Sequence, residues 1–351
     1  MSSVIELVRP ELRKLRPYRA ARYEAGLLRL NANETPWPPP GDQTKNGLNR
    51  YPEVRPATLT RRLARHYGLE PEQLLVTRGS SEAIDCLVRC FCRAGIDEIV
   101  ITPPTFGMYD FYAQVQGAGV RSVPLLRNRG FAVDTSAIVD GWAQNSKLLF
   151  LCSPNNPTGN AVPDEQIHRI CDSLGSRGLV VVDAAYVEFA NHDPTLDLLA
   201  AHENVVVLRT LSKALGLAGL RCGAVLGAPA VIDVLSAILP VYSFPKPSQA
   251  AALTYLEGDY EALFCERIQI LTRERQRLAT ALGSQPWVQR VWPSEGNFLL
   301  LEVDEPEHVL GTAKAAGIML RDFSGEANLR GAIRITVGNA EQNDRLLEAL
   351  C

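Results

Sequence analysis

Residues 178–183 read Gly-Leu-Val-Val-Val-Asp, an apolar run of mostly β-branched residues that ends on a carboxylate. The run does not alternate between polar and apolar positions, which is typical of a strand buried on both faces. Runs of the same kind occur at residues 74–77, 98–102, 147–152 and 204–209. The sequence therefore predicts a sheet whose two faces are both covered.

Amphipathic stretches separate these runs, at residues 56–68, 80–95 and 163–178. The last stretch opens with Pro163 and ends in glycine, and both residues are typical of helix ends. Strands that alternate with helices favour a mostly parallel sheet, because parallel neighbours need a long crossover connection. We therefore predict an α/β fold for this part of the chain.

The pattern changes after about Pro240, where strands and helices mix in the manner of a smaller α+β domain. Residues 247–283 form a long helical pattern with a break near Gly258. Strands are predicted at 288–292, 297–303, 319–321 and 332–337, and helices at 307–317 and 340–350. We divide the chain into an N-terminal arm (1–29) that packs with the small domain, a large domain (30–244) and a small domain (245–351).

Composition excludes several classes of protein. The chain has 351 residues, of which 46% are hydrophobic and 21% charged, and these are ordinary values for a globular protein. The net charge of −3 gives no basic footprint for nucleic acid. No apolar segment approaches the roughly 20 residues needed to cross a bilayer, and no signal peptide is apparent, so we expect a soluble, cytoplasmic protein. The cysteines and the scattered histidines lack metal-ligand spacing, so we expect no metal site and reduced thiols.

Ligands of open α/β sheets bind beyond the carboxyl ends of the strands, so the residues after each predicted strand are the candidates for ligand binding. After residues 74–77, Ser80 and Ser81 open a helix whose free N–H groups could hold a phosphate. An ordinary serine cap, with Glu82 in the first turn, is the alternative. After residues 147–152, Asn156 stands among prolines, where it is either a fixed amide donor or part of a plain turn.

Two further loops carry ionisable groups. Asp183 ends its strand as a carboxylate that is costly to bury without a cationic partner, unless it only caps the next turn, and Tyr186 could place a phenol beside the same ligand. Lys213 lies in a loop rich in Gly and Ser, where it could serve as an amine nucleophile, a phosphate binder or a solvated charge. Arg221 adds a guanidinium fork suited to phosphate. Neither a P-loop nor a dinucleotide-binding fingerprint is present.

Together these loops offer partners for a phosphate, a ring nitrogen, a phenolic oxygen and a carbonyl. Pyridoxal 5′-phosphate has all four groups, and a lysine Schiff base with an acidic partner at the ring nitrogen is its expected arrangement. The sequence therefore predicts pyridoxal phosphate as cofactor.

The same residues carry a resemblance to a known family. The chain resembles the fold-type I aminotransferases, and more closely the histidinol-phosphate aminotransferases among them. The motifs are Leu-Asn-Ala-Asn-Glu (30–34), Arg-Tyr-Pro (50–52), Pro-Pro-Thr-Phe-Gly-Met-Tyr (103–109), Thr-Leu-Ser-Lys (210–213) and Ile-Arg-Ile-Thr-Val-Gly (333–338). They span nearly the whole chain. The resemblance implies a seven-stranded, mostly parallel sheet in the large domain.

The resemblance also implies roles. Lys213 would form the Schiff base and shuttle the proton, Asp183 would hold the ring nitrogen protonated, and Asn156 and Tyr186 would bind the phenolic oxygen. Phe106, where relatives often carry tyrosine, would stack on the ring. The residues implied to surround the phosphate are Ser80, Ser81, Thr210, Ser212 and Arg221, and Glu82 would also belong to the cofactor site. Relatives often have aspartate at the position of Ser81. Tyr51 would reach the phosphate of a neighbouring subunit, so a homodimer is expected. The implied substrate residues are Tyr18, Asn33, Arg321 and Arg334, although a structural salt bridge is the alternative for each arginine.

From this resemblance we expect an enzyme of histidine biosynthesis that transfers an amino group between L-histidinol phosphate and 2-oxoglutarate. An aromatic amino acid aminotransferase and a threonine-phosphate decarboxylase are alternatives within the same chemistry. A non-catalytic regulator that binds pyridoxal phosphate, and a dehydrogenase that binds NAD, are alternatives of other classes. The regulator would normally carry an additional DNA-binding domain, and the dehydrogenase lacks its glycine fingerprint here.

Overall fold

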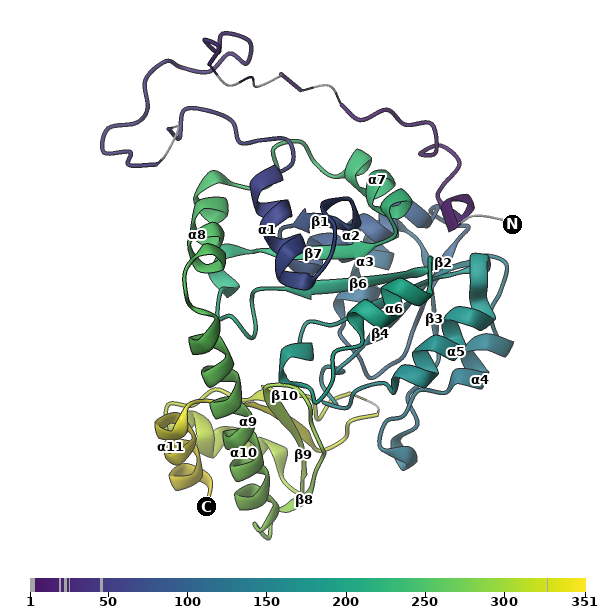
Figure 1. The fold of residues 1–351 in the computed structure, drawn as a ribbon. Helices are drawn as coiled ribbons and strands as arrows, with labels where there is room; N and C mark the ends of the chain where they lie inside the picture. Colours follow the sequence, from purple (N-terminus) through teal and green to yellow (C-terminus); the bar gives the residue numbers. More distant parts are fainter. Residues whose placement is uncertain (1–3, 19, 22–23, 25, 45–46, 327) are drawn as a thin grey trace.

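The computed structural model describes residues 4–18, 20–21, 24, 26–44, 47–326 and 328–351. A seven-stranded sheet forms its centre, and a four-stranded sheet lies toward the C-terminus (Figure 1). The large sheet comprises β1 (Leu74–Thr77), β2 (Glu98–Ile101), β3 (Gly119–Ser122), β4 (Ser146–Cys152), β5 (Leu179–Asp183), β6 (Val205–Thr210) and β7 (Gly223–Gly227). The small sheet comprises β8 (Val288–Val291), β9 (Phe298–Val303), β10 (Arg321–Asp322) and β11 (Ala332–Thr336). The predicted α/β fold with a smaller α+β part is confirmed.

The large sheet has the strand order β1-β7-β6-β5-β4-β2-β3. Its neighbouring strands are parallel except for the two pairs that involve β7. β7 pairs antiparallel with β6, and an irregular loop that contains one short 3₁₀ turn connects the two strands. The carboxyl ends of β1, β2, β4, β5 and β6 consequently meet at one edge of the sheet.

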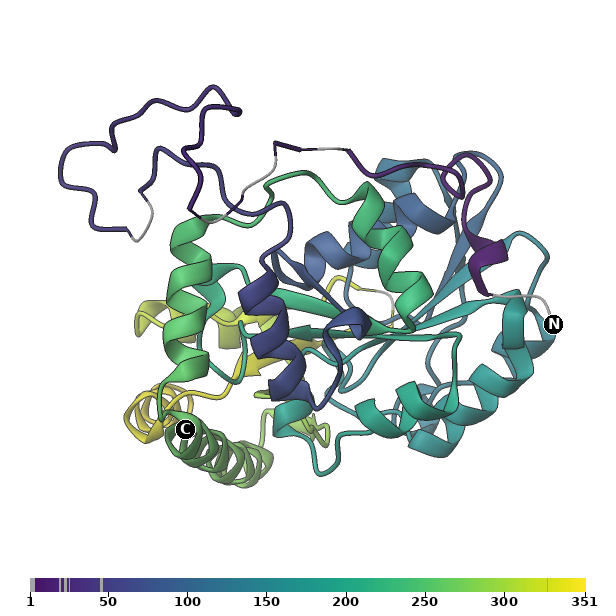
Figure 2. The ribbon, with the colours of Figure 1, turned by 45° about the horizontal axis from the view of Figure 1, so that its top comes forward.

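Helices cover both faces of the large sheet, as Figures 1 and 2 show. One face carries α2 (Gly79–Phe91), α3 (Met108–Gln116) and α7 (Pro229–Ile238), and the other carries α1 (Ala57–Tyr67), α4 (Thr135–Asp140), α5 (Asp164–Leu174) and α6 (Thr195–Ala201). Successive residues of β4 enter different cores: Phe150 packs with the first layer and Leu149 with the second. Burial on both faces explains why the strand runs are apolar throughout.

The small sheet is reached through α8 (Lys246–Glu257) and α9 (Glu261–Gly283) (Figure 1). It forms its own core with α9, α10 (Pro306–Ala315) and α11 (Ala340–Leu350). The two sheets also share buried side chains. Phe298 and Leu300 of β9 belong to the main core, and the rings of Phe131 and Trp292 lie 4.5 Å apart. The domain boundaries at residues 29/30 and 244/245 stay a prediction.

The start of the N-terminal arm lies on the helix layer of the large sheet. Val4 and Val8 are buried in the core that contains α2 and α7, and the Arg9 backbone N–H donates to the Cys90 carbonyl over 3.1 Å. Farther along, the chain runs out into a long irregular segment before it returns at α1 (Figures 1 and 2). The described beginning of the arm thus contacts the large domain, whereas we expected the arm to pack with the small domain.

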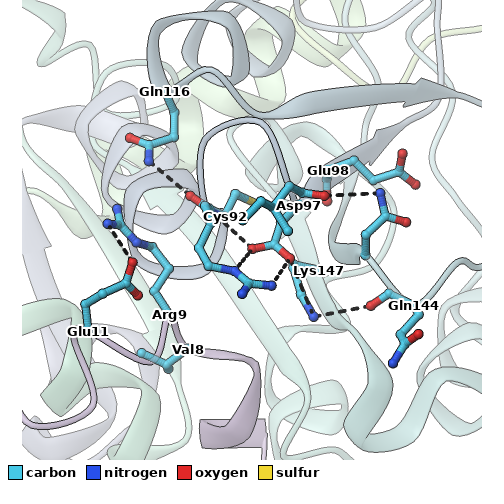
Figure 3. A network of polar contacts seen from close by, with 12 residues as sticks. Val8, Arg9, Glu11, Cys92, Asp97, Glu98, Gln116, Gln144 and Lys147 are labelled. Carbon is cyan, nitrogen blue, oxygen red and sulfur yellow. Dashed lines mark hydrogen bonds and ion pairs between the residues drawn. The ribbon is translucent and has the colours of Figure 1, made fainter.

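Polar contacts at the amino-terminal edge of the large sheet are seen in Figure 3, where Asp97 precedes β2. Asp97 is buried and accepts a 2.7 Å hydrogen bond from Arg93 Nε, and Lys147 Nζ lies 3.8 Å from its Oδ1 atom. The network ties the end of α2 to the starts of β2 and β4. Because it lies at the edge opposite the carboxyl ends, it supports the fold and does not line the ligand site.

Several elements of the structure were not predicted from the sequence. β3 is a partly exposed edge strand of sequence Gly-Val-Arg-Ser, and β7 begins with Gly223 and ends with Gly227. The helices α3, α4, α6 and α7 were likewise not predicted. Across the described ranges, no helix is both long and apolar enough to span a bilayer.

Candidate active site

A cavity of about 850 Å³ lies beyond the carboxyl edge of the large sheet. Loops after β1, β2, β4, β5 and β6 form its walls, and residues of the small domain close one side. The structure brings most of the sequence-predicted residues to this one cavity. Those that line it are Ser80, Ser81, Phe106, Asn156, Asp183, Tyr186, Thr210, Ser212, Lys213, Arg221, Arg321 and Arg334.

The first turn of α2 forms one end of the cavity. Ser80 and Ser81 lie in this turn, where backbone N–H groups have no partner within the helix and the helix dipole favours an anion. Gly79 has a φ of +76°, and a Cβ atom at this position would come within 2.8 Å of Arg221 Nη2. Glycine therefore lets the guanidinium approach the helix start. The combination can hold a phosphate group.

The loop after β6 approaches the same end of the cavity. Thr210 Oγ1 and Ser212 Oγ are hydrogen-bonded over 3.0 Å, and Arg221 Nη1 lies 3.5 Å from Ser212 Oγ. Arg221 adopts a left-handed φ of +54° that turns the chain into β7. Two hydroxyls and one guanidinium therefore face the α2 turn.

Asp183 ends β5 as a carboxylate that is almost fully buried. Its Oδ2 atom accepts a 2.8 Å hydrogen bond from the Tyr109 hydroxyl, and its Oδ1 atom accepts a 3.3 Å bond from the Ala185 backbone N–H. Burial raises the pKa of Asp183 to about 6, even though these two bonds and the nearby Lys213 act in the opposite direction. A cationic group in the cavity would therefore gain strongly from facing this carboxylate.

Lys213 extends its amine into the cavity, and its Nζ atom lies 5.5 Å from the centroid of the Tyr186 ring. The surrounding walls partly desolvate the amine and lower its pKa, and the positive charges of Arg334 and Arg221 lower it further. A lysine amine becomes a nucleophile or a base only when it is neutral, so this environment favours covalent chemistry at Nζ.

Asn156 joins the two domains at the cavity. Its side-chain Nδ2 donates to the Tyr186 hydroxyl over 3.4 Å, and its Oδ1 accepts from Arg334 Nη1 in a short contact. The preceding residue, Asn155, is buried and fixes the loop through its bonds to Thr105 and Thr158. The turn after β4 is therefore a rigid support for an amide, as its sequence suggested.

The two arginines of the small sheet lie side by side. Arg321 of β10 pairs in register with Arg334 of β11, and both line the cavity. The Arg334 guanidinium lies 5.4 Å from the Phe298 ring and 5.5 Å from the Phe323 ring. Burial lowers the pKa of Arg334, and so does the positive charge of Arg321. Within the described residues neither arginine forms a salt bridge, so both can bind an anion.

Glu82 lies at the edge of the site rather than in it. It is paired with Arg78 and lines a second cavity of about 350 Å³, which shares Ser81 and Arg221 with the first. Glu82 does not line the main cavity, and its predicted role with the cofactor stays a prediction.

Tyr18, Asn33 and Tyr51 do not line the cavity of their own chain. Tyr18 is 71% exposed, and Asn33 is exposed with a left-handed φ of +55°. The Tyr51 ring is half exposed and stacks on Tyr242 with centroids 4.8 Å apart. All three lie in the stretch between the N-terminal 3₁₀ turn (Val4–Leu7) and α1, whose described residues form no helix or strand.

Sequence reasoning missed Tyr109 as a site residue. Its hydroxyl donates a hydrogen bond to Asp183, but no helix was predicted around residue 109, and a tyrosine beside apolar residues carries no sign of a polar partner, so nothing distinguished it from an ordinary core residue. Asp110 and Glu326 also line the cavity and were not predicted.

Cysteines and histidines form no cluster of three or more metal-ligating groups in the part of the chain that the structure describes. All eight cysteines are free, and six are buried. We expected the histidines to be scattered, but two of them are in contact: His168 Nδ1 lies 2.7 Å from His202 Nε2.

Comparison with known proteins adds to this geometry. A model of the family described as aminotransferase class I and II matches residues 29–350. The chain is 43% identical over 354 residues to a histidinol-phosphate aminotransferase of Stenotrophomonas maltophilia, covering 100% of this chain and 97% of the relative. It is 45% identical over 353 residues to the enzyme of the same name from Xylella fastidiosa, with coverage of 99% and 96%. The solved histidinol-phosphate aminotransferase of Sinorhizobium meliloti, in complex with pyridoxal-5′-phosphate, has a TM-score of 0.76 at 26% identity and covers 86% and 82% of the two chains.

Proposed function

We propose, since the chain belongs to the class I and II aminotransferases, that it transfers an amino group between L-histidinol phosphate and 2-oxoglutarate. The products are imidazole acetol phosphate and L-glutamate, so the enzyme acts in histidine biosynthesis. The observation that carries the proposal is the joint placement of Lys213, Asp183 and Arg334 on one cavity. Full-length similarity to histidinol-phosphate aminotransferases supports the choice of substrate.

The residues present fit pyridoxal phosphate, the cofactor of this family. Gly79 leaves the Arg221 guanidinium close to the helix start, where a phosphate is favoured, and Asp183 offers a buried carboxylate to a protonated ring nitrogen. When bound, pyridoxal phosphate supplies an aldehyde that condenses with amines and a ring that withdraws electrons from the bond at the amine-bearing carbon. The residues that would hold it are Ser80, Ser81, Phe106, Asn156, Asp183, Tyr186, Thr210, Ser212 and Arg221.

Lys213 is the residue that carries the substrate's Cα proton during amino transfer. With its pKa lowered, the Nζ amine is neutral more often than that of an exposed lysine, and it takes the proton from Cα of the amino donor. In the second half-reaction the same Nζ atom returns a proton to Cα of the new amino acid. Tyr186 and Asn156 orient the site through their mutual hydrogen bond.

Arg334 and Arg321 bind the anionic end of each substrate. Histidinol phosphate carries a phosphate and no carboxylate, whereas 2-oxoglutarate carries two carboxylates, and a guanidinium fork accepts either group in bidentate fashion. Two adjacent arginines can therefore serve both half-reactions in one pocket. The Arg334 guanidinium contacts the rings of both Phe298 and Phe323, and these contacts limit its orientation.

A homodimer with shared active sites is part of the same proposal. Tyr18, Asn33 and Tyr51 lie outside the cavity of their own chain, on a segment that also exposes Leu28, Leu30 and Trp37. Large apolar side chains exposed together are typical of an interaction surface. A second copy of the chain would cover them and would bring Tyr51 toward Arg221 of its neighbour. The free, buried cysteines agree with a reducing, cytoplasmic location.

A single-turnover experiment tests the proposed function. Purified enzyme loaded with pyridoxal phosphate is mixed with L-histidinol phosphate in the absence of an oxo acid, and the absorbance band of the lysine-bound cofactor is followed. We expect the band to disappear with histidinol phosphate and to return when 2-oxoglutarate is added. Conversion by L-phenylalanine or L-tyrosine alone would replace the proposal by an aromatic aminotransferase, and carbon dioxide release from L-threonine phosphate would replace it by a decarboxylase.

A further inference from the structure

A completely buried phenol lies behind the carboxylate at the floor of the cavity. Tyr109, the second residue of α3, has no accessible surface, and its hydroxyl donates a 2.8 Å hydrogen bond to Asp183 Oδ2. The hydroxyl does not line the cavity, so it contacts the carboxylate from the protein side. Asp183 itself does line the cavity.

Packing fixes the direction of this hydroxyl. The Tyr109 ring stacks on Phe150 of β4, with centroids 4.7 Å apart and an interplanar angle of 15°. The edge-to-face contact with Phe106 has a centroid distance of 5.7 Å. Rings held on two sides in this way cannot swing the phenol away from Asp183 without opening the core.

The phenol remains a donor under all ordinary conditions. Burial raises the pKa of Tyr109 well above its ordinary value, and the negative charge of Asp183 raises it further, so the hydroxyl keeps its proton. The only other hydrogen bond that the Asp183 carboxylate accepts within the described residues is the longer one from the Ala185 N–H, at 3.3 Å. Tyr109 is therefore the main hydrogen-bond donor to the ionised carboxylate.

We propose that Tyr109 is a positioning residue that acts through Asp183: it holds the carboxylate in one orientation and stabilises its negative charge, so that the carboxylate can face the ring nitrogen of the cofactor. This inference rests on the proposed function, because it assumes that pyridoxal phosphate occupies the cavity. Tyr109 touches neither substrate nor cofactor. Its contribution reaches the reaction only through the charge and direction of Asp183.

The test compares Tyr109→Phe with the parent enzyme. The variant removes one oxygen and keeps the ring that packs against Phe150 and Phe106, so the fold is preserved. Tyr67→Phe is the matched control, because Tyr67 is a buried tyrosine of the large domain that does not line the cavity. The readouts are the dissociation constant of pyridoxal phosphate, measured by titration of cofactor-free protein, and kcat and KM for histidinol phosphate.

We expect Tyr109→Phe to weaken cofactor binding on the order of 10-fold, as the loss of a hydrogen bond to a charged group would. We expect kcat to fall with little change in KM, because the arginines that bind the substrate anion are untouched. In an Asp183→Asn background the same substitution should change cofactor binding by less than about 2-fold, since two residues that act as one unit are not additive. Tyr67→Phe should leave both readouts unchanged.

Two results would overturn the inference. One is a Tyr109→Phe enzyme whose cofactor affinity and kcat match those of the parent. The other is an equally large effect of Tyr109→Phe in the Asp183→Asn background, which would show that Tyr109 acts through the general packing of the core. If the parent protein itself fails to bind pyridoxal phosphate, the proposed function fails, and this inference fails with it. If the parent binds the cofactor and Tyr109→Phe behaves like the parent, only this inference fails. Cofactor binding by the parent therefore separates the two failures.

Discussion

Arg334 Nη1 donates a hydrogen bond to Asn156 Oδ1, and through this bond a strand of the small sheet reaches the loop after β4 of the large sheet. Asn156 in turn donates to the Tyr186 hydroxyl. The group proposed to bind the substrate anion is therefore connected, by one side chain, to the groups proposed to bind the phenolic oxygen of the cofactor. Because a guanidinium has five N–H donors, Arg334 can hold Asn156 and an anion at the same time.

The first prediction concerns Arg334. In Arg334→Gln, kcat/KM should fall on the order of 100-fold, because a partly buried fork that pairs with an anion is lost. The loss should be similar for histidinol phosphate and for 2-oxoglutarate, since both anions use the same guanidinium. Steady-state kinetics of each half-reaction measures this, with the exposed Arg330→Gln as control. A loss confined to one substrate would mean that the two anions bind at different places.

The second prediction concerns Gly79. In Gly79→Ala the new Cβ meets Arg221 Nη2 at 2.8 Å, on a backbone with a φ of +76°. The left-handed conformation alone costs about 1–2 kcal/mol for a residue with a side chain, and the displaced guanidinium should weaken cofactor binding as well. Chemical denaturation and cofactor titration measure the two effects.

Gly311→Ala is the matched control, because Gly311 lies within α10 and a Cβ there meets nothing within 4 Å. This substitution should raise stability by up to about 1 kcal/mol through helix propensity. If Gly79→Ala and Gly311→Ala had the same stability and the same cofactor affinity, the site would not require glycine at position 79.

The third prediction concerns pH. The pKa of Asp183 is about 6 in the folded, cofactor-free protein, against an ordinary value of 3.8 that the unfolded chain should retain. Between these two values the unfolded chain has released a proton that the folded protein keeps, so the contribution of Asp183 to stability is lost as the pH rises through 6. Asp183→Asn removes this effect. The free energy of unfolding of Asp183→Asn should exceed that of the parent by an amount that grows from near zero at about pH 4 to about 3 kcal/mol above pH 6.

Urea denaturation of both cofactor-free proteins across this pH range measures the difference. The Asn side chain can still accept the hydrogen bond from Tyr109, so the comparison isolates the charge. A difference that stays constant or shrinks as the pH rises would contradict the raised pKa of Asp183. With pyridoxal phosphate bound the sign should reverse, because the carboxylate then faces a cation.

Much of the fold follows from the sequence because its strands are buried on both faces, and this gives the unbroken apolar runs at β4, β5 and β6. The position of the loop after each of these strands was predictable for the same reason, because the loop begins where the apolar run ends. β7 could not be predicted, because its five residues begin and end with glycine and pair antiparallel only through the tertiary structure. Tyr109 was missed because a buried tyrosine in a helix has the same pattern whether or not its hydroxyl has a partner.

The fourth prediction concerns Lys213. In Lys213→Arg the positive charge is kept but no amine remains to condense with an aldehyde, so borohydride should fix no chromophore on the protein. Amino transfer should fall on the order of 1,000-fold or more, because the group that moves the proton is also lost. Mass spectrometry after reduction measures the first effect. Lys314→Arg, in the last turn of α10, is the control and should be labelled at Lys213 like the parent. A chromophore that is still fixed in Lys213→Arg would place the Schiff base on another lysine.

The last prediction tests whether active sites are shared. Tyr51 does not line the cavity of its own chain, and its ring is exposed beside Tyr242. If Tyr51 completes the site of a second copy, then Tyr51→Ala and Lys213→Ala should each lose activity alone. A mixed dimer of the two would contain one site with a native Lys213 and a native Tyr51, so co-expression should restore activity. Differently tagged chains allow the mixed dimer to be isolated and its rate per dimer compared with the parent. If Tyr51 served its own chain, the surviving lysine would stand beside an alanine and no activity would return.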